Sequence, residues 1–388
     1  MDLRRSSVDE QDSGFKSFLS KKDSCFIEEQ RNRATRIIQE AVKEGTIQKK
    51  YSKVIQSVLR NLRSSQRAGL IDFHIGMYES EEMGNLEDSQ IVRYIIHRYR
   101  YVVYPIMKIL DDYPPCLQIE PASICNYRCT FCFQSDQKFS RKFSGFMGTM
   151  TMDRFKKIID QIESHIEFVT LASRGEPLLA EDFISMIEYT KGKFLNLKIN
   201  TNASILTEKN VHAILSSGVQ TLIISADAAE EQLYSELRVH GNLKKILRNV
   251  EMFNDIREKQ YPDAKIITRV SGVMIDPEKQ NIDSMINLWG SLVDQISFVK
   301  CSPWKEMYQA DPNNISIPCS DLWRRMFVWY DGTINPCDND YKSTLKIGSI
   351  DEKSISELWR SKQYQYLRSQ HLNAKRSKLN LCRRCVVI

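Results

Sequence analysis

The sequence predicts an α/β protein, a partial (β/α)6 barrel with an N-terminal helical extension and a small C-terminal α+β domain. Strand-like and helix-like segments alternate six times over residues 116–304, which is typical of a parallel sheet built from βαβ units. The texture of the sequence changes on either side of this array, near residues 115 and 305. A chain of 388 residues also has room for two or three domains of about 150 residues each.

Residues 1–115 are predicted to form the helical extension. Apolar residues recur at mostly helical spacing over Phe26–Arg63, and a second helical stretch, rich in Arg, Tyr and Ile, covers Asp88–Leu110. The pair Pro114–Pro115 ends that stretch. Because the segment shows no hairpin pattern, we expect helices without a β-hairpin in it.

Residues 116–304 are predicted to form the barrel, with its chemistry on the loops that follow the carboxyl ends of the strands. Each expected strand is short and apolar, and an amphipathic helical pattern separates it from the next. The expected strands are Leu117–Glu120, Phe168–Leu171, Leu195–Asn200, Thr221–Ser225, Ile266–Ile275 and Gln295–Val299, and the expected helices are Met152–Glu163, Glu181–Lys193, Glu208–Ser216, Glu230–Leu237, Leu243–Glu258 and Gln280–Leu292.

Residues 305–388 are predicted to form the small C-terminal domain of short strands, turns and helices. The run Tyr330–Cys337 predicts a hairpin, because its Asp331-Gly332 pair is a strong turn sequence. Four of the ten cysteines lie in this segment, which makes it a candidate for a metal site of its own.

The composition indicates a soluble globular protein. Hydrophobic residues make up 42% and charged residues 27%, which excludes a disordered, collagen-like or small disulfide-stapled chain. The net charge of +6 is dispersed and does not by itself indicate nucleic acid binding. No apolar run approaches the ~20 residues of a membrane span, and residues 1–20 lack the apolar core of a signal peptide. We therefore expect a cytoplasmic protein whose cysteines are ligands or catalysts rather than disulfides.

The loop after the first expected strand contains Cys125, Cys129 and Cys132 in a C-x3-C-x2-C spacing. Three thiolates so close together can hold one metal centre. Iron–sulfur clusters normally have four Cys ligands, so a cluster held by three has one iron free for another ligand, which indicates catalysis. A zinc site with a fourth ligand elsewhere is the alternative, although no His lies near this loop.

Further motifs follow the cysteine loop in a characteristic order. Ser173–Pro177 (Ser-Arg-Gly-Glu-Pro) follows the second strand, Asn200–Ala203 ends the third, and Ser225–Asp227 ends the fourth, with Arg238 on the next helix. This series resembles the radical S-adenosylmethionine (SAM) superfamily, with its Gly-Gly-Glu-Pro, Thr-Asn-Gly and Ser-x-Asp…Arg motifs. The first Gly of Gly-Gly-Glu-Pro is Arg174 here. Taken alone, Gly-Glu-Pro could be only a tight turn and Arg238 only a solvated helix residue.

The resemblance implies that Cys125, Cys129 and Cys132 ligate three irons of a [4Fe–4S] cluster whose fourth iron chelates SAM. Reductive cleavage of SAM would then give a 5′-deoxyadenosyl radical that abstracts hydrogen from a C–H bond. Glu176 would accept a hydrogen bond from the SAM ammonium group, and Gly175 would let the backbone approach SAM closely. The SAM-binding residues that the resemblance implies are Phe131, Gly175, Glu176, Pro177, Asn200, Asn202, Ser225, Asp227 and Arg238.

The C-terminal segment holds a second cysteine set. Cys319 and Cys337 are spaced C-x12-G-x4-C, and Cys382 and Cys385 form a C-x2-C pair. Four thiolates could hold a structural zinc, but the pattern resembles the SPASM/twitch extensions of radical SAM enzymes. No further cysteine follows Cys385, so the resemblance implies the shorter twitch form with one auxiliary [4Fe–4S] cluster. Four Cys ligands leave no iron open, which favours electron transfer.

Cys25, Cys116 and Cys301 fall outside both sets. A free cysteine is commonly a small buried hydrophobe, and we expect that role for all three. Cys301 differs from the other two in ending the sixth strand near the expected active face.

An auxiliary cluster near the substrate favours an oxidation, and twitch-type relatives include dehydrogenases of aminocyclitols. The main hypothesis is therefore a radical SAM oxidoreductase that dehydrogenates a polar small molecule, sugar-like or aminocyclitol-like, with reduced flavodoxin or ferredoxin as the electron donor. Candidates for the base or for a substrate-positioning group are Lys300, Arg269 and Arg174, which lie on or after strands; a residue of this kind is more often a structural ion-pair partner.

Two alternatives remain open from the sequence. A radical SAM maturase of peptide or protein side chains is the first, although its usual N-terminal winged-helix element finds no match in residues 1–115. A zinc protein that binds RNA is the second, because Ile91–Arg100 interleaves basic and aromatic residues. That run also fits a helix at a lipid interface or, more simply, a helix packed on the barrel with its Arg side chains outward.

Overall fold

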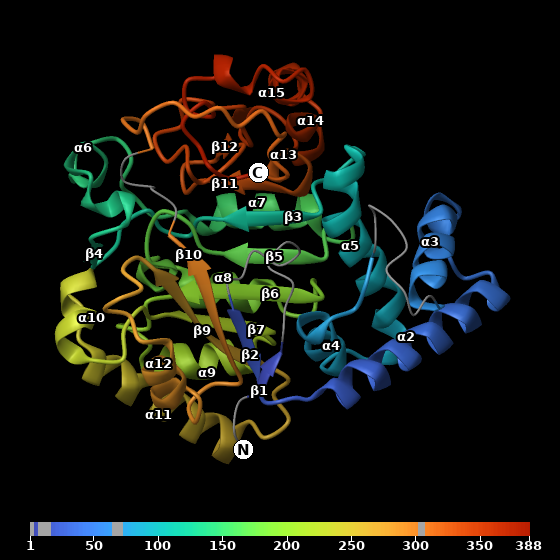
Figure 1. The fold of residues 1–388 in the computed structure, drawn as a ribbon, viewed down its shortest axis with the longest axis horizontal. Helices are drawn as coiled ribbons and strands as arrows, with labels where there is room; N and C mark the ends of the chain where they lie inside the picture. The colour runs from blue at the N-terminus through green and yellow to red at the C-terminus, as the bar shows by residue number, and fades with distance from the viewer. Residues whose placement is uncertain (1–3, 7–16, 64–72, 302–306) are drawn as a thin grey trace.

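The computed structural model of the chain describes residues 4–6, 17–63, 73–301 and 307–388. A single mixed sheet runs through the described residues in the strand order β1-β2-β10-β9-β7-β6-β5-β3-β11-β12-β13. Its six central strands are mutually parallel and are wrapped by helices (Figure 1). The predicted partial (β/α)6 barrel is confirmed. Its strands are β3 (Cys116–Ile119), β5 (Phe168–Leu171), β6 (Asn196–Thr201), β7 (Thr221–Ser225), β9 (Ile267–Met274) and β10 (Gln295–Lys300).

Helices that pack an apolar face on the sheet follow each barrel strand from β3 to β9, and two of them follow β7. The helices begin at side chains that accept a hydrogen bond from a backbone N–H of the first turn, such as Thr151, Thr207, Asn242 and Asn281. Residues on both faces of the strands are buried, as a parallel sheet requires. The helices are α7 (Met152–Ile162), α8 (Phe183–Tyr189), α9 (Glu208–Ser216), α10 (Glu231–Leu237), α11 (Leu243–Gln260) and α12 (Ile282–Trp289).

The N-terminal extension is helical, as expected, but it also contributes strands. Strand β2 (Ser17–Ser20) pairs antiparallel with β10 and with β1 (Arg4–Ser6), so the expectation of a segment without a hairpin is wrong. The missed strands are only 3 and 4 residues long, too short to show a period-2 pattern. The helices of the extension are α2 (Ser24–Glu44), α3 (Ser52–Arg63), α4 (Met77–Gly84) and α5 (Asp88–Met107), with the short η1 (Lys49–Tyr51) before α3.

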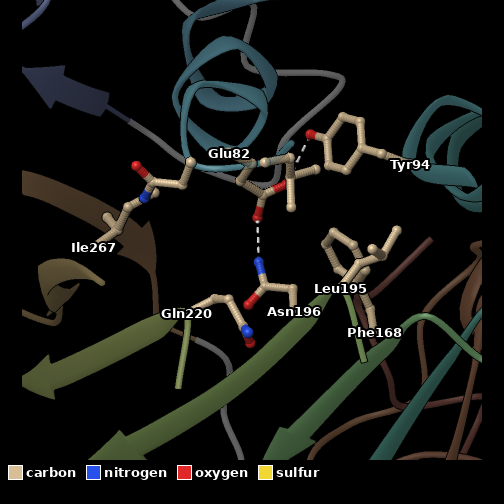
Figure 2. Close-up of a pocket in the computed structure, with 9 residues that line it drawn as sticks. Glu82, Tyr94, Phe168, Leu195, Asn196, Gln220 and Ile267 are labelled. Atoms are coloured by element: carbon tan, nitrogen blue, oxygen red, sulfur yellow. Dashed lines mark hydrogen bonds between the residues drawn. The ribbon is translucent and has the colours of Figure 1, made fainter. Parts of the chain in front are cut away.

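Helices α4 and α5 cover the amino ends of the barrel strands. Figure 2 shows Glu82 of α4 between Tyr94 of α5 and Asn196 of β6. The Glu82 carboxylate accepts hydrogen bonds from the Tyr94 hydroxyl at 2.8 Å and from Asn196 Nδ2 at 2.9 Å. The cavity beside them measures about 10 Å³, which is enough for about one water. The run Ile91–Arg100 lies within α5 and buries Ile91, Tyr94 and Ile95, as expected for a core helix. The expectation that its Arg side chains point outward is wrong for Arg98 and Arg100, which are buried.

The C-terminal domain continues the barrel sheet. Strand β11 (Arg325–Val328) pairs parallel with β3, and the predicted hairpin forms between β11 and β12 (Thr333–Asn335). Gly332 in its turn has a φ of +83°, which favours glycine. The expected domain boundary at residues 304 and 305 lies outside the described residues. The remaining elements are α13 (Asp321–Arg324), β13 (Gly348–Ser349), α14 (Ile355–Trp359), α15 (Lys362–Leu372) and η5 (Arg376–Lys378).

None of the helices in the described part of the chain combines the length and hydropathy of a membrane span.

Candidate active site

The first cysteine set lies on the loop that leaves the carboxyl end of β3. Strand β4 (Arg128–Cys129) in this loop pairs antiparallel with β8 (Arg238–Val239), so that Cys129 faces Arg238. Cys125, Cys129 and Cys132 belong to one apolar cluster with the aromatic rings of Tyr127 and Phe131. The β-pairing and this cluster fix the loop against the barrel and keep the three cysteines in one cluster.

Gly175 lies against the strand end that leads into the cysteine loop. A Cβ atom built on Gly175 would lie 2.4 Å from the Ile124 carbonyl oxygen and 2.5 Å from that of Ala122. The next residue, Glu176, donates its backbone N–H to Ile124 O at 2.9 Å. Only glycine fits this approach, because both obstacles are backbone atoms that cannot turn aside.

The Glu176 carboxylate is buried and multiply hydrogen-bonded. It accepts hydrogen bonds from Thr201 Oγ1 at 2.7 Å and from Asn202 N at 2.8 Å, both at the end of β6. Burial raises the pKa of Glu176 to about 7, so a nearby cation would stabilise the ionised carboxylate. Asn202 Nδ2 lies 4.0 Å from Cys125 Sγ, which connects the Glu176 network to the cysteine loop.

Asp227 and Arg238 form a buried ion pair beside the cysteine loop, with Asp227 Oδ2 and Arg238 Nε 2.7 Å apart. Asp227 Oδ1 accepts a hydrogen bond from Val273 N at 2.7 Å, and the Arg238 guanidinium lies over the Phe131 ring at 5.8 Å. Burial lowers the pKa of Arg238 but the charge of Asp227 outweighs it, so the pKa stays above its ordinary value. Arg238 is therefore a buried, paired cation, and it begins β8 just after the helix on which it was expected.

The second cysteine set is assembled from three separate segments. Arg376, which is 1% exposed, donates to Cys385 O at 2.6 Å and to Cys382 O at 3.1 Å. Asn335 Nδ2 donates to Cys337 O at 2.7 Å, and the Cys319 N–H donates to His371 Nδ1 at 3.1 Å. Sequence analysis did not single out Arg376, and an isolated arginine in a basic tail gives no pattern by which to find it.

Both cysteine sets line one cavity of about 740 Å³. Most of the expected SAM-binding residues line it too, among them Gly175, Glu176, Asn202 and Arg238, whereas Pro177 and Asp227 lie behind its wall. Asn200 also lines this cavity, and its Oδ1 is buried without a hydrogen-bond partner in the described residues. An orphaned acceptor and a backbone cradle that admits only glycine both fit a polar ligand in this space.

The thiols of both sets fit iron–sulfur ligation. Burial raises the pKa of Cys125 and that of Cys382 to about 12, so each thiolate needs a metal cation to offset its desolvation. In the described parts of the chain no three His, Cys, Asp or Glu side chains are grouped for a single metal ion. The cysteines line an extended space instead.

The three predicted catalytic residues occupy different settings. Lys300 is exposed at the end of β10 and at the edge of the cavity. Arg269 is buried on β9, where its Nε donates to Gln295 Oε1 at 2.7 Å. Arg174 is fully engaged: Nε and Nη2 donate to the Glu120 carboxylate at 2.7 and 2.6 Å, and Nη1 donates to Tyr341 O at 2.9 Å. These contacts give Arg174 a structural role, so we leave it out of the proposed reaction.

The three cysteines outside both sets differ from one another. Cys116 is buried at the start of β3, as expected for a small hydrophobe. Cys25 is exposed, so the same expectation is wrong there. Cys301 is partly buried and packs against the apolar cluster of the first cysteine set.

A parallel barrel with a three-cysteine loop at its mouth and a second cysteine domain defines a class of iron–sulfur protein. Comparison with known families shows which one. The Radical SAM superfamily matches residues 119–272, and an iron–sulfur cluster-binding domain, SPASM, matches residues 319–386. The chain belongs to the radical SAM superfamily and carries a C-terminal SPASM/twitch-type domain. The protein therefore uses SAM and a [4Fe–4S] cluster, and its C-terminal domain binds iron–sulfur as well.

Relatives with known activities are distant. The chain is 24% identical to the SAM-dependent 2-deoxy-scyllo-inosamine dehydrogenase of Niallia circulans, over 71% of this chain and 94% of that protein. It is also 24% identical to the mycofactocin maturase MftC of Mycolicibacterium smegmatis, over 47% of this chain but only 44% of that longer relative. The family match favours an enzyme over the zinc-dependent RNA-binding alternative.

Solved structures show the same fold. BtrN in complex with AdoMet and 2-DOIA aligns with a TM-score of 0.50 and 19% identity, over 72% of this chain and 95% of that one. Streptococcus suis SuiB bound to precursor peptide SuiA aligns with a TM-score of 0.53 and 15% identity, over 94% of this chain and 91% of that one.

Proposed function

We propose that this protein dehydrogenates a polar small molecule after hydrogen abstraction by a radical derived from SAM. The observation that carries this proposal is that both cysteine sets line the same cavity. In this proposal Cys125, Cys129 and Cys132 ligate the cluster that binds SAM. The ligands of a single auxiliary cluster are Cys319, Cys337, Cys382 and Cys385.

When bound, the first cluster and SAM supply a radical that abstracts hydrogen, and the second cluster supplies a one-electron acceptor. For an alcohol, the substrate gives one hydrogen atom to the 5′-carbon derived from SAM, one proton to a base or water, and one electron to the acceptor. The electron taken up to cleave SAM is thereby matched by the electron released, so turnover requires no net reductant. A reduced flavodoxin or ferredoxin would supply the initial electron.

The residues of the chain position the reactants. In this proposal the Glu176 carboxylate accepts a hydrogen bond from the SAM ammonium group, and Arg238, beside the cysteine loop, binds the carboxylate or ribose. Asn200 and Ser225 present polar atoms to the cavity from the ends of β6 and β7. Lys300 is the proposed base, because a lysine can lose a proton whereas Arg269 stays protonated in a protein.

A peptide or protein maturase is the second candidate, because the sequence resembles MftC and because the N-terminal extension does contain a β-hairpin. The two candidates differ in what the cavity must admit. A small molecule would be enclosed in it, whereas a peptide must also cross its rim.

Anaerobic reconstitution with iron and sulfide, followed by reduction and addition of SAM, tests the proposed function. We expect 5′-deoxyadenosine and methionine, and a reduced-cluster EPR signal that changes when SAM is added. The matched control is Cys25→Ala, which removes an exposed cysteine far from both sets in the sequence and should change neither result. An EPR spectrum that does not change when SAM is added, with no 5′-deoxyadenosine formed, would falsify the proposal.

A further inference from the structure

The cavity has a basic floor at the amino ends of the barrel strands, formed by five side chains. In a parallel barrel, alternate residues of a strand point inward. On β9 the inward series from bottom to top is Arg269, Ser271 and Val273, and on β6 it begins with Lys198 and Asn200; all five line the cavity. The floor comprises Arg98 from α5, Lys198, Arg269, and the neighbours Arg324 and Arg325 at the start of β11.

Two tyrosine rings hold the floor together. The Tyr78 ring of α4 has Arg269 at 4.8 Å, Lys198 at 5.0 Å and Arg98 at 5.3 Å from its centroid. The Tyr101 ring of α5 has Arg324 at 4.8 Å, Arg98 at 5.2 Å and Arg325 at 6.0 Å. Aromatic faces attract cations, but cations gathered on shared rings repel one another in a partly desolvated site.

The carboxylates that offset these charges lie mostly behind the floor. Glu79 pairs with Arg98, and Glu82 Oε1 lies 3.1 Å from Lys198 Nζ, but neither acid lines the cavity. Glu81 faces Arg269 from the same helix and also stays outside the lining.

Basic side chains consequently outnumber acidic ones on the cavity wall. Of the lining residues, nine are Lys or Arg and three are Asp or Glu. One of the acids, Asp321, lies beside the floor with its Oδ1 3.3 Å from Arg325 Nε, and Asp338 comes from the segment that carries Cys337. The surface that meets a ligand at the floor is therefore positive.

Two donors on this floor, the Nε atoms of Arg98 and Arg325, have no hydrogen-bond acceptor within the described structure. Arg98 is 7% exposed, and its Nε is buried without a hydrogen-bond partner. An unmet donor on a buried guanidinium costs free energy unless an acceptor arrives. An anion in the cavity would supply that acceptor and would relieve the repulsion among the floor cations at the same time.

We propose that this basic floor binds an oxyanion of the substrate, a carboxylate or a phosphate. The inference rests on the proposed function and narrows its substrate to an anionic small molecule. Val273 lies four residues beyond Arg269 on β9. At a rise of about 3.3 Å per residue, the floor therefore lies roughly 13 Å below the level of Val273. A substrate anchored at the floor would reach up toward the SAM site with its reacting carbon. An amine such as 2-deoxy-scyllo-inosamine, the substrate named for the Niallia circulans relative, would meet repulsion there.

Titration of the reconstituted holoprotein with inorganic phosphate and with malonate, by isothermal calorimetry at low ionic strength, tests this proposal. We expect at least one of the two anions to bind, at least fivefold more weakly in both Arg269→Gln and Arg324→Gln. Arg324 is only partly buried, so its variant keeps the test decisive where Arg269→Gln fails to fold. Arg60→Gln, on the exposed face of α3, is the matched control and should bind as the wild type does.

The comparison of phosphate with malonate distinguishes a phosphate from a carboxylate on the substrate, because the anion that binds more tightly has the same kind of charged group as the natural substrate. Absence of binding by both anions, or equal binding in the Arg269→Gln, Arg324→Gln and wild-type proteins, would overturn the proposal. Formation of 5′-deoxyadenosine without added substrate is independent of the floor. A protein that cleaves SAM but ignores both anions therefore refutes the anionic substrate and leaves the proposed function standing.

Discussion

The two cysteine sets are built in different ways. The three thiols of the first set lie within Cys125–Cys132, on one loop between β3 and η2 (Phe133–Ser135). The four of the second set come from before α13, from after β12 and from the C-terminal segment, and Arg376 ties the last of these segments together. The first set is therefore shaped by local chain geometry, and the second by tertiary packing.

The same difference separates their proposed roles. A set of three ligands leaves a site for a cofactor, and Gly175 and Glu176 lie beside it. A set of four leaves none and suits an electron acceptor. Substitutions in the two sets should therefore cause two distinguishable defects, a loss of SAM cleavage for the first set and a loss of substrate oxidation for the second.

The largest effect is expected at the first set. Substitution of Cys125, Cys129 or Cys132 by Ala should abolish formation of 5′-deoxyadenosine, because no other thiol can hold the open cluster. The auxiliary cluster should stay, so iron falls from about eight to about four atoms per chain. Product analysis and iron determination on the same samples check this prediction, and 5′-deoxyadenosine formation in all three variants would contradict it.

The next effect separates the two sets. The double substitution Cys382→Ala/Cys385→Ala should also halve the iron content, but cleavage of SAM should continue because the first set is intact. Oxidation of substrate should be lost, since the electron acceptor is missing. An unchanged iron content in the double variant would remove the auxiliary cluster from the proposal.

Gly175→Ala probes the contact between the two halves of the SAM site. The new Cβ would collide with the carbonyls of Ile124 and Ala122, so the strand end before Cys125 must shift. A displacement of about 1 Å at a reacting centre can cost on the order of 100-fold in rate, and we expect a loss of that order in SAM cleavage. Iron content should stay near that of the wild type; a wild-type rate would show that the loop tolerates the shift.

The contrast between the two sets also explains what could be predicted from sequence. The first set could be proposed from sequence alone, because its spacing and the Ser173–Pro177 motif are contiguous and follow strands with clear apolar patterns. The ends of β5, β7 and α9 were predicted to the residue. The four cysteines of the second set could be proposed as a set only because the sequence has few cysteines, so that those in distant segments can be considered together.

What was missed depends on contacts that are distant in sequence. The pairing of β11 with β3 and of β2 with β10 leaves no local pattern. Arg174 was expected near the substrate, yet its partner Glu120 lies one strand away and became visible only in the fold. The basic floor likewise joins α5, β6, β9 and β11, and no window of sequence contains it.

Arg174→Met should be the most destabilising substitution outside the cysteine sets. Arg174 is 2% exposed and Glu120 is fully buried, and removal of one partner from a buried pair typically costs about 3–5 kcal/mol. The variant also loses the hydrogen bond to Tyr341 O that connects the barrel to the C-terminal domain. Thermal unfolding of the holoprotein measures the loss; the double variant with Glu120→Gln should recover part of it, because no unpaired charge is then buried.

The smallest effect is expected at a second connection between the same two domains, on the surface. Asp351 lies 3.0 Å from Arg154 of α7 and 3.9 Å from Lys157, and its side chain is 50% exposed. Exposed ion pairs contribute little, so Asp351→Asn should cost less than about 1 kcal/mol. Screening gives an independent check: at about 0.5 M salt the Asp351→Asn difference should vanish, whereas that of Arg174→Met should persist because its pair is buried. A large, salt-resistant loss in Asp351→Asn would mean that the surface pair, and not the continuous sheet with its buried Arg174–Glu120 contact, holds the C-terminal domain on the barrel.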